Sequence, residues 1–316
     1  MKLKPSASSS DPARIAIIGC GNVGMACAHA LVVGHLIREL VLIDQDADRA
    51  KGEAMDLQQA VPLGSPITIS TGTYADAAAS AIVILTIGAP VKFSGSRLDM
   101  LAPNVGPFRD CVAKLMAEKF KGILLITTNP VDVLTFIAQK EAGLPVGHVI
   151  GTGTMIDSER LRSHLSSQLQ IEARSVHATI IGEHGDSSVA IWSSAQVGGI
   201  PLALYPGAES LPSNEDLLTA VQRIGSEVTA LKGNTCYAIA ACVARICEAV
   251  LRDEHSILVV STLIDGPYGL HDVAFGTPCV IGRGGVESVL ELKLDAKEQK
   301  ALERSAGLLK KAFASL

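Results

Sequence analysis

One histidine in this chain has neighbours suited to proton transfer. His184 lies in the segment Gly182-Glu183-His184-Gly185-Asp186-Ser187-Ser188, among small, flexible and acidic residues. An imidazole titrates near neutral pH, so it can donate or accept a proton during a reaction. Upstream, Asp157-Ser158-Glu159-Arg160 offers a carboxylate that could orient the ring and a guanidinium that could bind a substrate carboxylate. These residues predict a proton-transfer site for a small anionic substrate.

A glycine-rich turn near the N-terminus predicts a dinucleotide site. The apolar run Ile15–Ile18 leads into Gly19-Cys20-Gly21-Asn22-Val23-Gly24 and then into a helical pattern. Gly19 allows a tight turn, Gly21 lets a pyrophosphate approach the backbone, and Gly24 allows close contact between helix and strand. Asp44 follows the next apolar run and would accept hydrogen bonds from the adenosine ribose while repelling a 2′-phosphate, which favours NAD over NADP. A methyltransferase or a nucleotide-sensing regulator could use a similar loop.

Bulk composition excludes several classes of partner. The chain has 316 residues, of which 48% are hydrophobic and 19% charged, so it can bury the core of two ordinary domains. The net charge is −5 and the basic residues are scattered, which gives no footprint for nucleic acid or an anionic membrane. The odd set of seven cysteines lacks a CxxC pair, so we expect no disulfide framework and no metal site, and we expect a cytoplasmic location.

Alternating apolar runs and helical patterns predict an α/β fold. Short runs rich in β-branched residues occur at 14–18, 40–43, 67–70, 81–86, 122–127 and, more weakly, 149–150. Such runs suit strands covered on both faces, and we expect a Rossmann-type doubly wound parallel sheet, with helices at 22–33 and 104–120 packed on it. From about residue 152 we expect a second, mixed α+β substrate domain, with helices at 158–169, 215–231, 235–253 and 297–315. We therefore predict a flexible tail at 1–11, an NAD-binding domain at 12–151 and a substrate domain at 152–316.

With these motifs in place, the chain resembles the L-lactate and malate dehydrogenase family from Ala13 to its C-terminus, closest to the L-lactate enzymes. The motifs that carry the resemblance keep their order and spacing: Gly19-x-Gly21-x-x-Gly24, Thr128-Asn129-Pro130-Val131-Asp132, Gly151-Thr152-Gly153-Thr154, Asp157-x-x-Arg160 and Gly182-Glu183-His184-Gly185-Asp186. The resemblance implies an oxidoreductase that moves a hydride between NADH and a small 2-oxo acid, most simply pyruvate, in a step of glycolysis.

The resemblance also implies roles for single residues. His184 would exchange a proton with the carbonyl oxygen, Asp157 would orient its ring, and Arg160 would anchor the substrate carboxylate. A loop between Gly88 and Pro103 would close over the substrate and bring Arg97 to polarise the carbonyl. Besides the glycines and Asp44, the residues expected at the cofactor are Asn22, Val23, Gly88 and Asn129, and Asn129 would also lie near the carbonyl.

The choice of 2-hydroxy acid stays open. In the family a lid residue, usually Gln for lactate or Arg for malate, sets the substrate, and here Val91 falls on that position. Without a cation at Val91 a second carboxylate would lack a partner, although Lys92 is adjacent. Thr235 matches the lactate enzymes, whereas the small residues Gly225 and Ser226 suggest room for larger aliphatic acids of the 2-hydroxyisocaproate type. Malate is a further alternative.

Two further implications concern regulation and assembly. Arg162 and His177 match positions that bind fructose 1,6-bisphosphate in many bacterial lactate dehydrogenases, although the same pair occurs in members that ignore this effector. The family also suggests a homotetramer. A non-catalytic sensor of NAD redox state is the alternative from another class, and it would need the glycine-rich turn but not His184, Arg97 or Arg160.

Overall fold

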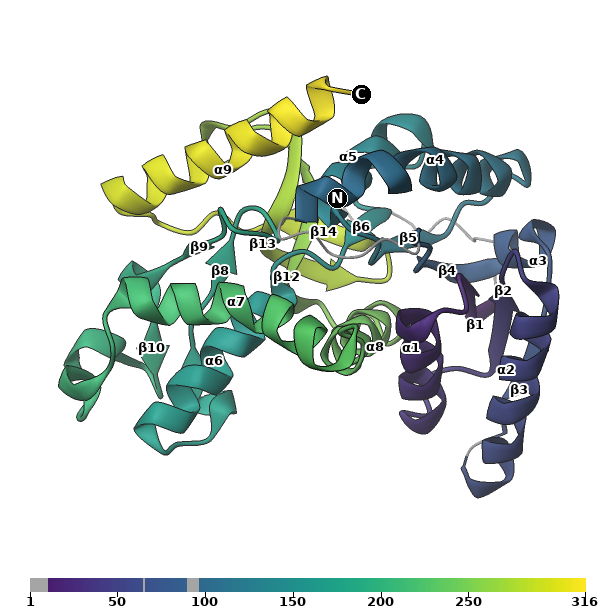
Figure 1. Ribbon diagram of the computed structural model, residues 1–316, viewed down its shortest axis with the longest axis horizontal. Helices are drawn as coiled ribbons and strands as arrows, with labels where there is room; N and C mark the ends of the chain where they lie inside the picture. The colour runs from purple at the N-terminus through teal and green to yellow at the C-terminus, as the bar shows by residue number, and fades with distance from the viewer. Residues whose placement is uncertain (1–10, 65, 90–96) are drawn as a thin grey trace, which may run out of the picture.

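The computed structural model describes residues 11–64, 66–89 and 97–316. Its first half forms six parallel strands in the spatial order β3-β2-β1-β4-β5-β6, which confirms the predicted doubly wound sheet (Figure 1). The strands are β1 (Asp11–Ile18), β2 (Glu39–Ile43), β3 (Thr68–Thr71), β4 (Ser80–Leu85), β5 (Ile123–Ile126) and β6 (Val149–Gly151). The helices between them are α1 (Asn22–Val33), α2 (Ala47–Ala60), α3 (Tyr74–Ala78), α4 (Leu101–Ala117) and α5 (Val131–Glu141).

The second half extends the same sheet with antiparallel strands. Strands β12 (Ser256–Ile264), β13 (Val273–Gly282) and β14 (Gly285–Val289) follow one another beyond β6. The junction is narrow, since β12 pairs with β6 only between Ser261 and Gly151. The predicted mixed α+β unit is therefore present, but its main strands share one nine-stranded sheet with the first half.

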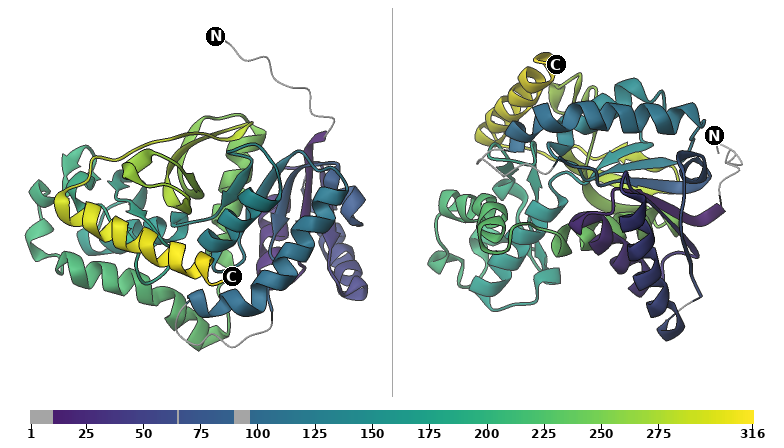
Figure 2. Two further views of the ribbon diagram at one scale, coloured as in Figure 1. Left: turned by 90° about the horizontal axis from the view of Figure 1, so that it is seen from above. Right: turned by 45° about the vertical axis from the view of Figure 1, so that its right-hand side comes forward.

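Four further helices and five short strands complete the second half of the described chain. They are α6 (Met155–Leu169), α7 (Asn214–Lys232), α8 (Tyr237–Leu251), α9 (Ala296–Ala314) and the short strands β7 (Val176–His177), β8 (Ile180–Ile181), β9 (Val189–Ala190), β10 (Gln196–Val197) and β11 (Ile200–Pro201). Helix α8 packs against α1. Helices α6 and α7 pack on each other and lie beyond β12, away from α1 and α2 (Figures 1 and 2).

Two apolar layers enclose the sheet. Ile15 and Ile17 of β1 face the layer formed with α1, α2 and α8, while Ile18 faces the layer formed with α4, α5 and α9. In Figure 1, α4, α5 and α9 lie above the sheet, and α1, α2 and α8 lie below it. Because successive side chains of a strand alternate between faces, a continuous apolar run is what a doubly covered strand requires. A third, smaller core joins α6 and α7 to the short strands.

Element boundaries agree with the sequence predictions to within a few residues. Helix α1 matches its predicted range, while α4 begins three residues earlier than predicted, because Pro103 is tolerated in a first helical turn. Asp11, assigned by sequence to the tail, is instead the first residue of β1 and pairs with Ser80; residues 1–10 lie outside the described residues. No helix in the described ranges has the length and hydropathy to cross a bilayer.

Candidate active site

His184 is held by the Asp157 side chain in a nearly closed environment. The loop after β8 carries His184, and the first turn of α6 carries Asp157. His184 Nδ1 lies 2.5 Å from Asp157 Oδ2, and the two side chains are 10% and 7% exposed. Because Nδ1 is engaged by the carboxylate, Nε2 is the ring nitrogen that can exchange a proton with a ligand. The structure thus joins two residues that lie 27 positions apart in the chain.

Two guanidinium groups meet beside this pair. Arg160 stands one helical turn after Asp157 and donates from Nη1 to Asp157 Oδ1 at 3.1 Å. Arg97 begins a short 3₁₀ helix, Arg97–Met100, that leads into α4. A Cβ placed on Gly225 of α7 would lie 2.8 Å from Arg97 Nη2 and 3.5 Å from Arg160 Nη2. Arg97 and Arg160 therefore approach the same point on α7, and a larger residue at position 225 would displace them.

The charged groups of this cluster change the pKa of His184. Burial lowers the pKa of His184, and the Arg97 and Arg160 charges lower it further, whereas Asp157 opposes them. Burial alone would raise the pKa of Asp157, but His184 and both arginines hold it below its ordinary value. One carboxylate faces two guanidiniums and an imidazole, so the site favours an additional anion. Such an anion would restore the pKa of His184 and so promote the imidazolium.

The glycine-rich turn has the shape that a pyrophosphate needs. Gly19 has φ +110°, and a Cβ on Gly24 would stand 1.9 Å from the Gly19 carbonyl oxygen, so neither position accepts a side chain. A Cβ on Gly21 would meet no atom within 4 Å, which leaves open space at the N-terminus of α1. The first turn of α1 also carries Asn22, which is exposed, and Val23, which is half-buried. Backbone N–H groups at this helix end fit a phosphate.

Asp44 lies beside the turn at the end of β2. Its Oδ2 accepts a hydrogen bond from the Cys20 backbone N–H at 2.6 Å, and its Oδ1 accepts one from the Asp46 N–H at 3.0 Å. The carboxylate therefore connects β2 with the glycine-rich turn. Its half-buried position at this edge is compatible with the predicted contact to a ribose, because each carboxylate oxygen can accept more than one hydrogen bond.

Asn129 and Gly88 lie at the carboxyl ends of β5 and β4. Asn104 connects these ends, because its amide donates to the Asn129 carbonyl at 2.8 Å and accepts from the Ala89 N–H at 2.8 Å. Gly88 is exposed. The buried Oδ1 of Asn129 has no hydrogen-bond partner among the described residues. An unpartnered buried oxygen at the carboxyl edge of a parallel sheet suits a ligand donor such as an amide.

The residues predicted to set substrate specificity and regulation are not among those that the described interactions join to the His184–Asp157 pair. Val91 and Lys92 lie outside the described residues, and Thr235 is half-buried in the turn between α7 and α8. Arg162 donates to the Val176 carbonyl at 2.9 Å and to Glu159 at 2.7 Å, next to the exposed His177 of β7. Arg162 and His177 thus lie next to each other at the Val176 carbonyl.

Three supporting residues received no role from the sequence. Asp132 accepts a hydrogen bond from the His184 backbone N–H at 2.7 Å, and Ser305 of α9 accepts one from the Glu183 N–H at 2.9 Å. Thr86 donates to the Gly19 carbonyl at 2.6 Å. Asp132 belongs to a motif that was recognised, yet its partner lies 52 residues away. No local pattern could have indicated any of these contacts.

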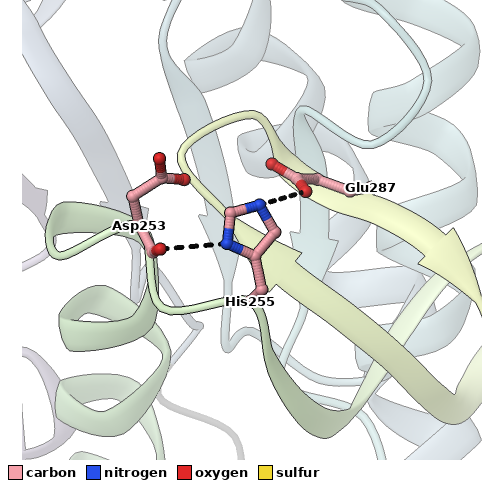
Figure 3. A group of neighbouring side chains, drawn as sticks. All are labelled: Asp253, His255 and Glu287. Carbon is pink, nitrogen blue, oxygen red and sulfur yellow. Dashed lines mark hydrogen bonds and ion pairs between the residues drawn. The ribbon is translucent and has the colours of Figure 1, made fainter.

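Within the described part of the chain, one group of side chains has metal-ligand spacing. Asp253, His255 and Glu287 each offer a donor atom within 4.8 Å of the others, and the group lies where the turn after α8 meets the β13–β14 hairpin (Figure 3). His255 already uses Nδ1 on the Asp253 carbonyl at 3.0 Å and Nε2 on Glu287 at 3.1 Å, while the Asp253 carboxylate accepts from the Arg283 N–H. We therefore assign the group a structural role in joining the two turns.

Both halves of the chain match family models, and these matches define its class. Residues 13–151 match the NAD-binding domain of lactate/malate dehydrogenases, and residues 154–315 match the α/β C-terminal domain of the same enzymes. The chain belongs to the lactate/malate dehydrogenase family.

Individual relatives with high similarity to this chain are L-lactate dehydrogenases. The chain is 44% identical to an L-lactate dehydrogenase of Nitratidesulfovibrio vulgaris and 42% identical to one of Thermoanaerobacter, each over 307 residues that cover 96% of this chain and 99% of the relative. It also superposes on the crystal structure of the minor L-lactate dehydrogenase of Enterococcus mundtii, in a ligand-bound form, with a TM-score of 0.92 and 35% identity. That match covers 98% of this chain and 99% of the other.

Proposed function

We propose that this protein is an NAD-dependent L-lactate dehydrogenase that reduces pyruvate to L-lactate and catalyses the reverse oxidation. The observation that supports this most strongly is the buried His184–Asp157 pair, which faces the two guanidiniums of Arg97 and Arg160. Hydroxy-acid oxidation needs a proton acceptor and a carboxylate anchor in one place. A protein that only senses NAD would need neither.

The proposed cofactor fits the glycine-rich turn. Gly19, Gly21 and Gly24 would hold the pyrophosphate at the start of α1, with Asn22 and Val23 in its first turn, and Asp44 would bind the adenosine ribose. Gly88 and Asn129 would line the nicotinamide end. When bound, NADH supplies the hydride that C2 of the 2-oxo acid receives.

The chain's own residues would manage the substrate and the proton. Arg160 would bind the substrate carboxylate in a planar two-pronged contact, and Arg97 would polarise the carbonyl. His184 would deliver its Nε2 proton to the carbonyl oxygen as the new C–H bond forms at C2. Before this transfer Asp157 would stabilise the protonated, charged ring, and it would fix the orientation of the ring throughout. In the oxidation, neutral His184 would take the hydroxyl proton.

The substrate preference that we propose is pyruvate. Three relatives of this chain bear the name L-lactate dehydrogenase. The small residue Gly225 suggested room for longer aliphatic acids, yet the space beside it is occupied by the end of Arg97. Activity with 2-oxoisocaproate would therefore require Arg97 to move. Oxaloacetate remains less favourable, because Val91 offers no cation for its additional carboxylate.

A substrate panel tests the proposal directly. NADH absorbance is followed with pyruvate, 2-oxoisocaproate and oxaloacetate, and pyruvate should give the highest kcat/KM. The variant His184→Ala should lower kcat by about 10²–10⁴-fold, since a positioned acid-base group typically contributes that much, while NADH binding is preserved. Wild-type protein that binds NADH but oxidises none of it with any 2-oxo acid would support the sensor instead.

Regulation and setting complete the proposal. Arg162 lies beside His177, and a guanidinium with an imidazole can bind a phosphate group. This pair supports fructose 1,6-bisphosphate as an activator. An unchanged pyruvate saturation curve on adding the sugar bisphosphate would contradict this. The assembly that we propose is a homotetramer. The proposed setting is a reducing cytoplasm, because all seven cysteines are free and buried.

A further inference from the structure

The loop between β8 and β9, residues 182–188, carries His184 and is called the catalytic loop below. Two carboxylates hold this loop at His184 itself. The Asp157 carboxylate binds the ring from α6, and the Asp132 carboxylate binds the backbone N–H from α5 at 2.7 Å. The neighbouring residues are anchored as well, because Gly182 pairs with Gly276 of β13 and the Glu183 N–H donates to Ser305. The Asp132 contact differs from the others because it is made by the backbone of His184 itself.

Asp132 occupies an unfavourable place for a carboxyl group. It is 2% exposed, and its Oδ1 accepts no hydrogen bond within ordinary distance, although the Ser261 hydroxyl lies near enough to favour the ionised form. It also lines a narrow cleft, together with the apolar Phe136 and Phe313 and the charged Asp272 and Lys310. A buried acid with an unsatisfied oxygen costs stability. Packing alone does not account for this residue, whereas the His184 contact does.

We propose that Asp132 is a positioning residue, whose carboxyl oxygen holds the backbone of His184 so that the imidazole meets both Asp157 and the substrate. This inference rests on the proposed function for its catalytic consequence. The role requires a hydrogen-bond acceptor and no charge, because a neutral carboxyl or an amide oxygen accepts from a backbone N–H as an ionised carboxylate does.

The electrostatic surroundings agree with a role that needs no charge. Burial, with smaller contributions from the carboxylates of Glu183 and Asp157, raises the pKa of Asp132 to about 7 against the opposing effects of the His184 N–H and the Ser261 hydroxyl. These surroundings favour the neutral form of the Asp132 carboxyl, which still accepts a hydrogen bond from a backbone N–H. The His184 ring is influenced by Asp157, Arg97 and Arg160, so a shift of its backbone changes its distance to all three groups.

Two near-isosteric variants separate the acceptor from the packing. Asp132→Asn keeps an oxygen for the His184 N–H, and its amide can donate to the Ser261 hydroxyl, whose oxygen has no partner among the described residues. Asp132→Leu has a similar shape, can pack against Phe136 and Phe313 of the cleft and removes the acceptor. We expect Asp132→Asn to retain kcat within about threefold, whereas Asp132→Leu should lose about 10–100-fold in kcat, because small misplacements of a reacting group have effects of this size. The Kd for NADH should not change in either variant.

A matched control removes general effects of destabilising α5. Gln139 lies two turns beyond Asp132, is buried, and donates to the Leu144 carbonyl, with no contact to the catalytic loop among the described interactions. Gln139→Ala should lower Tm and leave kcat unchanged. Asp132→Leu should lower kcat even where its Tm falls no further than that of Gln139→Ala, because it removes the acceptor of the His184 N–H. If Asp132→Leu fails to fold, Asp132→Ala serves the same comparison with a cavity in place of the side chain.

An NMR titration of the His184 ring gives a readout that does not depend on turnover. Its resonances are assigned by their loss in His184→Ala. Since Asp157 supports the charged ring, displacement should lower the pKa of His184 in Asp132→Leu and not in Asp132→Asn. Equal kcat and equal His184 titration in wild type and Asp132→Leu would overturn the positioning role, as would an Asp132→Asn variant as impaired as Asp132→Leu. Failure of the proposed function would instead appear in the wild type, as absent activity with an intact titration difference between the variants.

Discussion

Arg160 divides its guanidinium between a protein carboxylate and the space that faces α7. Nη1 binds Asp157 at 3.1 Å, and the side chain is 11% exposed, so a lysine could not reproduce both the planar shape and the second donor. We expect Arg160→Lys to lower kcat/KM for pyruvate by about 10–100-fold, mainly through KM, because a charge-assisted two-pronged contact contributes about 1.5–3 kcal/mol. Steady-state kinetics at saturating NADH measures this.

The control for Arg160 is an arginine whose ion pair is exposed. Arg174 pairs with Glu172 at 3.3 Å, and its side chain is 88% exposed, so the interaction is screened by water. Arg174→Lys should leave both kinetic constants unchanged. If Arg160→Lys bound pyruvate as tightly as the wild type, the anchor would have to be another residue, and Arg97 would be the next candidate.

At the scale of elements, Gly225 leaves room on helix α7 for the Arg97 guanidinium. A glycine inside a helix costs about 0.5–1 kcal/mol relative to alanine, so Gly225→Ala should raise the free energy of unfolding by about that amount. The new Cβ would lie 2.8 Å from Arg97 Nη2, and Arg97 can move because it is the end of a flexible side chain. We therefore expect a more stable protein whose kcat falls about tenfold or more, since Arg97 would be displaced from its proposed position at the carbonyl. Urea unfolding and steady-state kinetics measure the two effects.

Helix α2 supplies the matched control for Gly225. Gly52 is exposed in the helix interior, and a Cβ there would meet no atom within 4 Å. Gly52→Ala should give the same gain in stability with unchanged kcat. Loss of activity in both variants would indicate a general stiffening of the fold, and no loss in either would remove Arg97 from the catalytic step.

Regular patterns made several elements predictable, and uniform burial concealed others. Helix α1 was predicted over its full length, because glycines flank it and its apolar positions recur at helical spacing. Helix α5 was not predicted, since every residue from Val131 to Gln139 is buried and no polar face marks its period. Helix α2 was missed for the opposite reason, because only Ala50, Ala54 and Leu57 are buried. Periodicity reports the contrast between two faces and fails when that contrast is weak.

Across the whole molecule, long-range contacts set what the sequence could not indicate. Motif spacing identified His184, Asp157 and Arg160, and the structure brings them together. The continuation of the sheet depends on one residue pair, Gly151 with Ser261, which lies 110 positions apart and has no local signature. The same holds for the His184 contact with Asp132. Sequence motifs name groups that carry chemistry, whereas the groups that position them depend on the tertiary fold.

Asp132, the buried acid that contacts the catalytic loop, also affects the stability of the entire protein. The pKa of Asp132 rises from 3.8 to about 7 on folding, mainly through burial, so the folded state binds a proton that the unfolded state releases. The contribution to stability is therefore complete below about pH 4 and is lost as pH rises toward 7, by up to about 1.4 kcal/mol for each pH unit. Asp157 and His184 have lowered pKa values and act in the opposite direction, since their contributions are lost as pH falls.

Because Asp132→Asn leaves Asp157 and His184 in place, the difference in unfolding free energy between this variant and the wild type isolates the effect of Asp132. We expect the free energy of unfolding of Asp132→Asn, relative to wild type, to increase from pH 5 to pH 8 in urea titrations at one protein concentration. Parallel curves for the two proteins across this range would mean that Asp132 is ionised in the folded state throughout.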